Sequence, residues 1–284
     1  MSFSLQFVLV LIGTFMIALV LTPLVRLFSF KIDAVDYPNA RRINTKPMPS
    51  AGGLSIVIAF SIATLVFIPM LTSTTAPIKS YLSYTLPVVG AGWIIALTGL
   101  IDDVKELSAK KKMIGILLAA SLVWFLTDFR LNDFKIPFGG PLLHFEPWLS
   151  YLLTVIWIVA ITNAVNLIDG LDGLVSGVSI ISLVTMGIVS YFFLPVPNLF
   201  LTMTIFVLVA SIAGFFPFNY HPAILYLGDT GALFIGFMIS VLSLQGLKNA
   251  TAVAVVTPMI ILWCTDYRYL FSHYPSDPIW SKIL

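Results

Sequence analysis

The sequence predicts an all-α fold, a polytopic integral membrane bundle of about nine helices with its N-terminus outside. Composition and apolar patterning carry this prediction. Of the 284 residues, 59% are hydrophobic and only 10% are charged, whereas soluble domains carry roughly 25% charged residues. The mean hydropathy is +1.01. The apolar residues are gathered into stretches of about 20, the length that crosses roughly 30 Å of hydrocarbon.

Nine stretches of the chain are apolar enough for membrane spans. They cover about residues 4–25, 52–72, 85–101, 113–127, 148–165, 174–195, 198–215, 231–247 and 252–265. The third and fourth are short, and only a turn at Pro195 and Pro197 separates the sixth from the seventh. Because repeats and soluble linkers are absent, residues 1–262 are predicted to form one membrane-embedded domain.

The Lys and Arg residues are distributed unevenly between the two sets of connecting loops. If the N-terminus lies outside, the cytoplasmic loops hold nine of them and the opposite loops hold four. Basic loops are retained on the cytoplasmic side, so we predict a multi-pass protein of the cell membrane with its polar site facing the cytoplasm. For Lys110, Lys111 and Lys112 an equal alternative is that they only orient the chain.

Net charge and cysteine content exclude two other classes of protein. A formal charge of +2 is too small to support binding of nucleic acid by electrostatics. One cysteine, Cys264, can form neither an intrachain disulfide nor a cysteine-based zinc cluster. Any chemistry must therefore come from other side chains.

Acidic side chains gather on the predicted cytoplasmic face. Five of them lie at or close to the ends of spans: Asp102, Asp103, Asp169, Asp172 and Asp229. Acidic residues contribute little to membrane topology, so insertion does not explain this asymmetry. An ionisable group at that depth is costly and indicates a functional site. These five aspartates are the candidate site.

Asp102 and Asp103 are adjacent carboxylates directly after the third predicted span. Two such groups repel each other, and burial makes it harder to keep both ionised. A divalent cation relieves both problems, and Mg²⁺ prefers carboxylate and phosphate oxygens. The alternative is an ordinary turn in free water at the membrane surface.

The segment 163–173 reads Asn-Ala-Val-Asn-Leu-Ile-Asp-Gly-Leu-Asp-Gly. Three-residue spacing brings Asn163, Asn166 and Asp169 near one another on a helix, and Asp172 follows after a glycine that lets the backbone turn. Apolar residues fill the intervening positions, so a solvated helix face does not explain the polar ones. The motif predicts a patch of amide and carboxylate oxygens facing a ligand.

Two further cytoplasmic loops contribute polar groups. Asp229, between two glycines at the start of a predicted span, either caps that helix or presents a carboxylate to a metal or phosphate. The proline-rich segment 36–53 contains Arg41, Arg42 and Lys46. Arginine suits bidentate contacts to phosphate, with the anionic inner leaflet as the competing partner. Together the loops indicate phosphoryl transfer at the membrane interface.

These motifs, in this order, resemble the polyprenyl-phosphate N-acetylhexosamine-1-phosphate transferases from about residue 20 to residue 262. The first loop, with Asp36, Pro38, the arginine pair, Pro47-x-Pro49 and Gly52-Gly53, is similar to that of the bacterial undecaprenyl-phosphate N-acetylglucosamine-1-phosphate transferases. The resemblance implies transfer of GlcNAc-1-phosphate from UDP-GlcNAc to undecaprenyl phosphate with release of UMP, using Mg²⁺ or Mn²⁺. That reaction begins teichoic-acid or other surface polysaccharide synthesis. A homodimer is allowed, since the sequence does not determine the oligomeric state.

The resemblance also implies roles for single residues. Asp102 and Asp103 match the family's aspartate pair, Asp102 as candidate base or nucleophile and Asp103 as a catalytic and metal-binding group. Asp229 matches the principal metal-ligand position, and Asp169 and Asp172 belong to the catalytic motif. Asn166 matches the nucleotide-sugar motif, and the other predicted substrate-binding residues are Asn163, Arg41, Arg42, Lys46 and Lys111.

The sequence departs from the family pattern at two places. Asn44 stands where these enzymes usually have His. Codons for residues 263–269, read one base later, can encode Gly-Val-Pro-Ile-Thr-Asp, the motif expected at that point. We therefore expect residues 263–284 to be a divergent, frameshifted tail. A one-base insertion or deletion near codon 262 of the gene would show this.

Three alternatives to this function stay open. A phospho-MurNAc-pentapeptide translocase would use a different sugar donor. An inactive truncated remnant follows if the divergent tail has replaced segments that catalysis needs. A membrane transporter is the alternative outside the enzymes. Transporters, however, place their charges near the bilayer centre, whereas these carboxylates gather at one interface.

Overall fold

The computed structural model describes residues 3–38, 46–72, 78–135, 142–194 and 199–245. Within these ranges the only strands form two short hairpins and the helices are joined by loops, which confirms the predicted all-α class. Six helices in the described ranges are long and apolar enough to cross a membrane, so the predicted count of nine spans is not confirmed. The predicted span 252–265 and the predicted tail 263–284 lie outside the described residues.

The predicted spans that fall within the described ranges are all helical. The helices are α1 (Phe3–Lys31), α2 (Gly53–Ile62), the π-helical turn η1 (Ala63–Phe67), α3 (Ile68–Thr72), α4 (Ile78–Lys105), α5 (Ala109–Leu126), α6 (Pro147–Leu167), α7 (Leu174–Phe192), α8 (Leu199–Asn219) and α9 (Gly228–Ser243). The segment from α2 through η1 to α3 forms a single candidate span over most of its length. The helix α9 is shorter than the six candidate spans.

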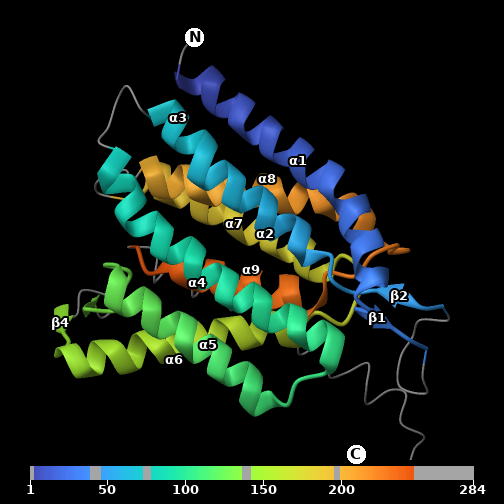
Figure 1. Ribbon diagram of the computed structural model, residues 1–284. Coiled ribbons are helices and arrows are strands. Elements are labelled where there is room, and N and C mark those ends of the chain that lie inside the picture. The colour runs from blue at the N-terminus through green and yellow to red at the C-terminus, as the bar shows by residue number, and fades with distance from the viewer. Residues whose placement is uncertain (1–2, 39–45, 73–77, 136–141, 195–198, 246–284) are drawn as a thin grey trace, which may run out of the picture.

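Two antiparallel strand pairs lie at opposite ends of the bundle (Figure 1). The strand β1 (Val35–Asp36) pairs with β2 (Met48–Pro49), and β3 (Asp133–Lys135) pairs with β4 (Leu142–His144). The β1–β2 pair lies at the end where α1 and α4 finish and where α5 and α9 begin. The five aspartates of the polar motifs belong to this end.

The helix α9 lies at the centre of the bundle, against α4, α6 and α2 (Figure 1). Each of its residues from Thr230 to Ser243 is buried. Small residues let helices approach closely in a membrane, and α9 uses them: a Cβ at Gly236 would lie 2.9 Å from the Cα of Thr162 on α6. Three helices therefore enclose α9, whose first turn carries Asp229.

The end of the first loop is joined to the segment before α9 by backbone hydrogen bonds. The N–H of Tyr226 donates to the carbonyl of Pro49 at 2.9 Å, and the N–H groups of Gly52 and Gly53 donate to the carbonyls of Tyr226 and Leu227 at 3.0 and 2.9 Å. The proline- and glycine-rich end of the first loop thus anchors the N-terminus of α9.

The closest approach of α4 to α9 leads to a test of this packing. A Cβ at Gly99 would lie 2.5 Å from the backbone N of Thr230, so Gly99→Ala must push the two helices apart. Overpacking of this kind costs about 1–3 kcal/mol, and we expect a lower thermal midpoint in detergent. Gly90→Ala is the matched control, because a Cβ at this position of α4 meets no atom within 4 Å. Equal midpoints for the two variants would contradict the prediction.

Candidate active site

A cleft of ≈ 1240 Å³ opens at the end of the bundle that carries β1–β2 and the start of α9. Its walls come from the first loop, the end of α4, the loop after α6 and the loop before α9. All five predicted aspartates line it: Asp102, Asp103, Asp169, Asp172 and Asp229. The structure therefore brings together groups from three separate parts of the sequence, as the transferase interpretation requires.

The ammonium group of Lys112, in the first turn of α5, joins two of these aspartates. Its Nζ lies 2.6 Å from Oδ2 of Asp102 and also forms an ion pair with Oδ2 of Asp229. The other oxygen of Asp102 accepts a hydrogen bond from the N–H of Leu107 at 2.5 Å. A single cation thus bridges carboxylates that lie 127 positions apart in the chain.

The end of α6 supplies the next two polar groups. Asn166 donates from Nδ2 to Oδ1 of Asp229 at 2.8 Å, so both oxygens of Asp229 have partners. Asp169 follows the helix and lines the cleft. Burial raises the pKa of Asp169 to about 8, and the negative charge of Asp229 adds to the rise. The cleft therefore favours a neutral Asp169 unless a cation lies near it.

Asp103 and Asp172 are bonded to backbone groups. Both oxygens of Asp103 accept hydrogen bonds from the start of α9, from the N–H of Asp229 at 2.9 Å and the N–H of Thr230 at 3.0 Å. Oδ2 of Asp172 accepts from the N–H of Ala223 and lies 3.0 Å from Nδ1 of His221. Asp172 therefore holds the loop before α9 that forms one wall of the cleft.

The remaining predicted substrate-binding residues have different outcomes. Lys46 lines the cleft. Asn163 donates from Nδ2 to the carbonyl of Val159 in its own helix at 2.8 Å and is not among the described residues that line the cleft. Lys111 is exposed on α5 and likewise lies outside that lining. Arg41 and Arg42 lie outside the described residues.

Sequence reasoning missed two side chains of the site. Lys112, rather than Lys111, contacts the aspartates, and the run of three lysines contained no signal that separates them. His221 pairs with Asp172, although an isolated histidine in a loop gave little reason to expect a partner. Asp229, one of the two partners of Lys112, and Asp172, the partner of His221, come from distant parts of the chain.

The carboxylates of the cleft can be compared with those that hold a divalent cation. No group of three or more His, Cys, Asp or Glu side chains in the described ranges could hold a metal by itself. The carboxylates of Asp102 and Asp229 nevertheless meet a single positive charge, that of Lys112. Mg²⁺ is commonly held by one or two carboxylates together with substrate phosphates and water. Two carboxylates that converge on one cation fit this chemistry.

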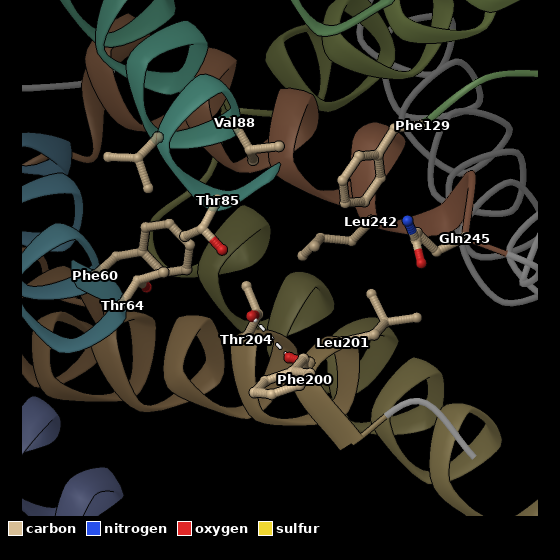
Figure 2. A pocket seen from close by; sticks show the side chains of 11 residues that line it. Phe60, Thr64, Thr85, Val88, Phe129, Phe200, Leu201, Thr204, Leu242 and Gln245 are labelled. Carbon is tan, nitrogen blue, oxygen red and sulfur yellow. Dashed lines mark hydrogen bonds between the residues drawn. The ribbon is translucent and has the colours of Figure 1, made fainter. Parts of the chain in front are cut away.

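A second, smaller cavity of ≈ 220 Å³ lies deeper in the bundle among α2, η1, α4, α8 and α9. Figure 2 shows phenylalanine rings and threonine hydroxyls around it, among them Phe60, Phe129 and Thr85. Val88 of α4 lines it and lies 14 residues before Asp102, which is about 20 Å along a helix. None of its described lining residues is charged, so this cavity has no groups for the chemistry of the cleft.

The helical membrane bundle and its aspartate-lined cleft define a class, the membrane-embedded transferases. Comparison with known proteins gives the family. The model of glycosyl transferase family 4 matches residues 85–247, which include most of α4, the whole of α5 to α9 and all five aspartates. The chain belongs to this family of glycosyltransferases.

Several relatives are similar along most of the chain. A probable undecaprenyl-phosphate N-acetylglucosaminyl 1-phosphate transferase of Bacillus subtilis is 40% identical over 90% of this chain and 68% of its own length. A decaprenyl-phosphate N-acetylglucosaminephosphotransferase of Mycolicibacterium smegmatis is 32% identical over 77% of this chain and 55% of its own. A phospho-N-acetylmuramoyl-pentapeptide-transferase of Staphylococcus saprophyticus is 33% identical over 84% and 74%. The chain thus spans between half and three quarters of these relatives.

Proposed function

We propose that this protein transfers GlcNAc-1-phosphate from UDP-GlcNAc to undecaprenyl phosphate, which yields the undecaprenyl-diphosphate-linked sugar and UMP. The observation that carries the proposal is the bridge through Lys112 that joins Asp102 and Asp229, two aspartates that line a cleft at the end of a membrane bundle. The 40% identity to the Bacillus transferase supports the choice of donor sugar and acceptor lipid. In the cell the reaction would begin a teichoic acid or another cell-wall polysaccharide.

The dimensions of the cleft support a nucleotide sugar as donor. Its volume of ≈ 1240 Å³ exceeds the roughly 300–1,000 Å³ of sites for drug-sized ligands. Lys46 and Lys105 line it together with the aspartates, so its walls carry the positive charge that suits a pyrophosphate. Asp172 and the loop before α9, to which Asp172 is hydrogen-bonded, supply polar groups away from the Asp102–Lys112–Asp229 bridge.

Asp102 and Asp229 are the residues that would hold a Mg²⁺ or Mn²⁺ ion. Such an ion neutralises charge on the transferring phosphoryl group and on the leaving phosphate. It would compete with the Lys112 ammonium for the two carboxylates. When Lys112 leaves Asp229, its ammonium is free to contact phosphate oxygens of the donor.

The reaction itself is one displacement at phosphorus. An oxygen of the lipid phosphate attacks the phosphorus that bears the sugar, the bond from that phosphorus to the bridging oxygen breaks, and UMP leaves with the bond's electron pair. The lipid phosphate is already anionic near neutral pH, so the step needs no strong base. The protein's part is positioning and charge neutralisation. Asp102 orients Lys112, and Asn166 orients Asp229.

Access from the membrane supports a lipid acceptor. Asp102 lies in the last turn of α4, which is itself a candidate membrane span, so the cleft borders the bilayer surface where a polyprenyl phosphate presents its head group. The helix α1 begins at the end of the bundle opposite the cleft (Figure 1). A cleft facing the cytoplasm therefore goes with an external N-terminus, as the distribution of Lys and Arg predicts. Association into a homodimer stays a prediction.

A parallel donor assay tests the proposal. The full chain in detergent is incubated with undecaprenyl phosphate, Mg²⁺ and either UDP-GlcNAc or UDP-MurNAc-pentapeptide, and UMP release is measured. We expect UMP from UDP-GlcNAc only. Release from the pentapeptide donor alone would establish the translocase activity instead. Release from neither, when a version with the frame restored after residue 262 is active, would identify this chain as an inactive remnant.

A further inference from the structure

The helix α9 begins without a cap from its own segment. The residue before its first turn, Leu227, provides no side-chain hydrogen bond to the helix. The first N–H groups of a helix have no partner within the helix, and at this end of the bundle they lie among buried side chains. A side chain from another element must satisfy them.

Asp103 of α4 provides that cap. Its Oδ1 accepts from the N–H of Asp229 at 2.9 Å, and its Oδ2 accepts from the N–H of Thr230 at 3.0 Å and from the Thr230 hydroxyl at 2.5 Å. These N–H groups are the second and third of the helix, the ones that an N-cap side chain normally binds. The carboxylate charge also complements the positive end of the helix dipole.

Gly228, the first residue of α9, leaves room for the carboxylate of Asp103. Gly228 has a φ of +69°, a conformation that residues with a side chain rarely adopt. A Cβ at Gly228 would lie 2.8 Å from both carboxylate oxygens of Asp103. The glycine therefore permits the carboxylate to reach the helix end.

These bonds leave Asp103 little capacity for a metal. An ionised carboxylate has about four acceptor sites, and three of those of Asp103 are occupied by hydrogen bonds from α9. The carboxylate of Asp229, by contrast, extends to Lys112 and Asn166. The two aspartates therefore have different tasks, although the sequence suggested a metal ligand at both.

We propose that Asp103 and Thr230 are positioning residues that fix the first turn of α9 and so aim the carboxylate of Asp229, and that Asp103 is not itself a metal ligand. Thr230 is fully buried. The proposal rests on the proposed function, in which Asp229 holds the divalent ion.

Binding of Mn²⁺ alone, followed by electron paramagnetic resonance on the full chain in detergent, tests the proposal without turnover. Thr230→Val removes the hydroxyl and keeps the shape, and Thr230→Ser keeps the hydroxyl. We expect the valine variant to bind Mn²⁺ about tenfold more weakly, as loss of one hydrogen bond to a charged group implies, and the serine variant to bind like the wild type. Equal binding by all three would overturn the proposal.

Asp103→Asn separates a cap from a ligand. If Asp103 is a direct ligand, Asp103→Asn abolishes Mn²⁺ binding while Thr230→Val leaves it unchanged, and that result would refute our assignment. If Asp103 acts through α9, both variants weaken binding, and the double variant weakens it by less than the two effects combined. In both variants, transferase kinetics should show a lower kcat and an unchanged KM for UDP-GlcNAc.

A wild-type protein that bound no Mn²⁺ would refute the metal assignment of the proposed function and not the cap. In that case hydrogen exchange in the metal-free protein decides. We expect the amides of Asp229 and Thr230 to exchange faster in Thr230→Val than in Thr230→Ser. Identical exchange in the two variants would show that Thr230 does not hold the helix end.

Discussion

Replacing Asp229 by Asn is expected to abolish the divalent-dependent release of UMP, with kcat lowered by about 10²–10³-fold. This is the loss typical when one preorganised electrostatic contact to a developing charge is removed. Asp229 is the point where Lys112 and Asn166 converge, and in the proposed function it holds the metal. Asparagine retains the shape and the backbone N–H that donates to Asp103, so the fold should survive. UMP release is measured over a range of Mg²⁺ concentrations.

Asp128→Asn is the control for this experiment. Asp128 is an exposed acid in the turn after α5, at the end of the bundle away from the cleft. Its variant should turn over like the wild type at every Mg²⁺ concentration. Unchanged turnover in Asp229→Asn, at a thermal midpoint close to that of the wild type, would remove Asp229 from the metal site.

The positions of the helices could be predicted because membrane insertion depends on local composition. A span needs a run of apolar residues, and runs of this kind mark α1, α6, α7 and α8 clearly. The convergence of the aspartates could also be predicted, because motifs at the ends of spans on one side of a membrane all lie within the same thin layer at the membrane surface. The helix α9 shows the limit: hydropathy marks its length but does not indicate that it is enclosed by α4, α6 and α2.

The partners within the cleft could not be predicted, because they depend on how helices rotate against one another. Lys111 and Lys112 are equivalent in the sequence, yet a step of one residue turns a helical side chain by about 100°, and only Lys112 faces the aspartates. Asn163 has the spacing of the motif but bonds to its own helix. Asp102 and Asp103 are adjacent on one helix and so point in different directions. Asp103 contacts the start of α9, and Asp102 contacts Lys112.

Removing the charge of Lys112 separates its two roles. In Lys112→Met, Asp102 and Asp229 lose the cation that they share. Two unpaired carboxylates repel each other and attract a divalent ion more strongly, so the Mg²⁺ concentration for half-maximal activity should fall. Turnover should fall as well, by about 10²-fold, because the ammonium no longer stabilises charge on the donor phosphates.

Tighter metal binding together with slower turnover is the result that distinguishes this role from a structural one. A lysine that only supported the fold would lower the thermal midpoint and weaken metal binding when replaced. Lys111→Met is the matched control, since the neighbouring side chain is exposed on the same helix, and both of its parameters should match those of the wild type. Wild-type turnover in Lys112→Met would show that the charge bridging the two aspartates takes no part in transfer.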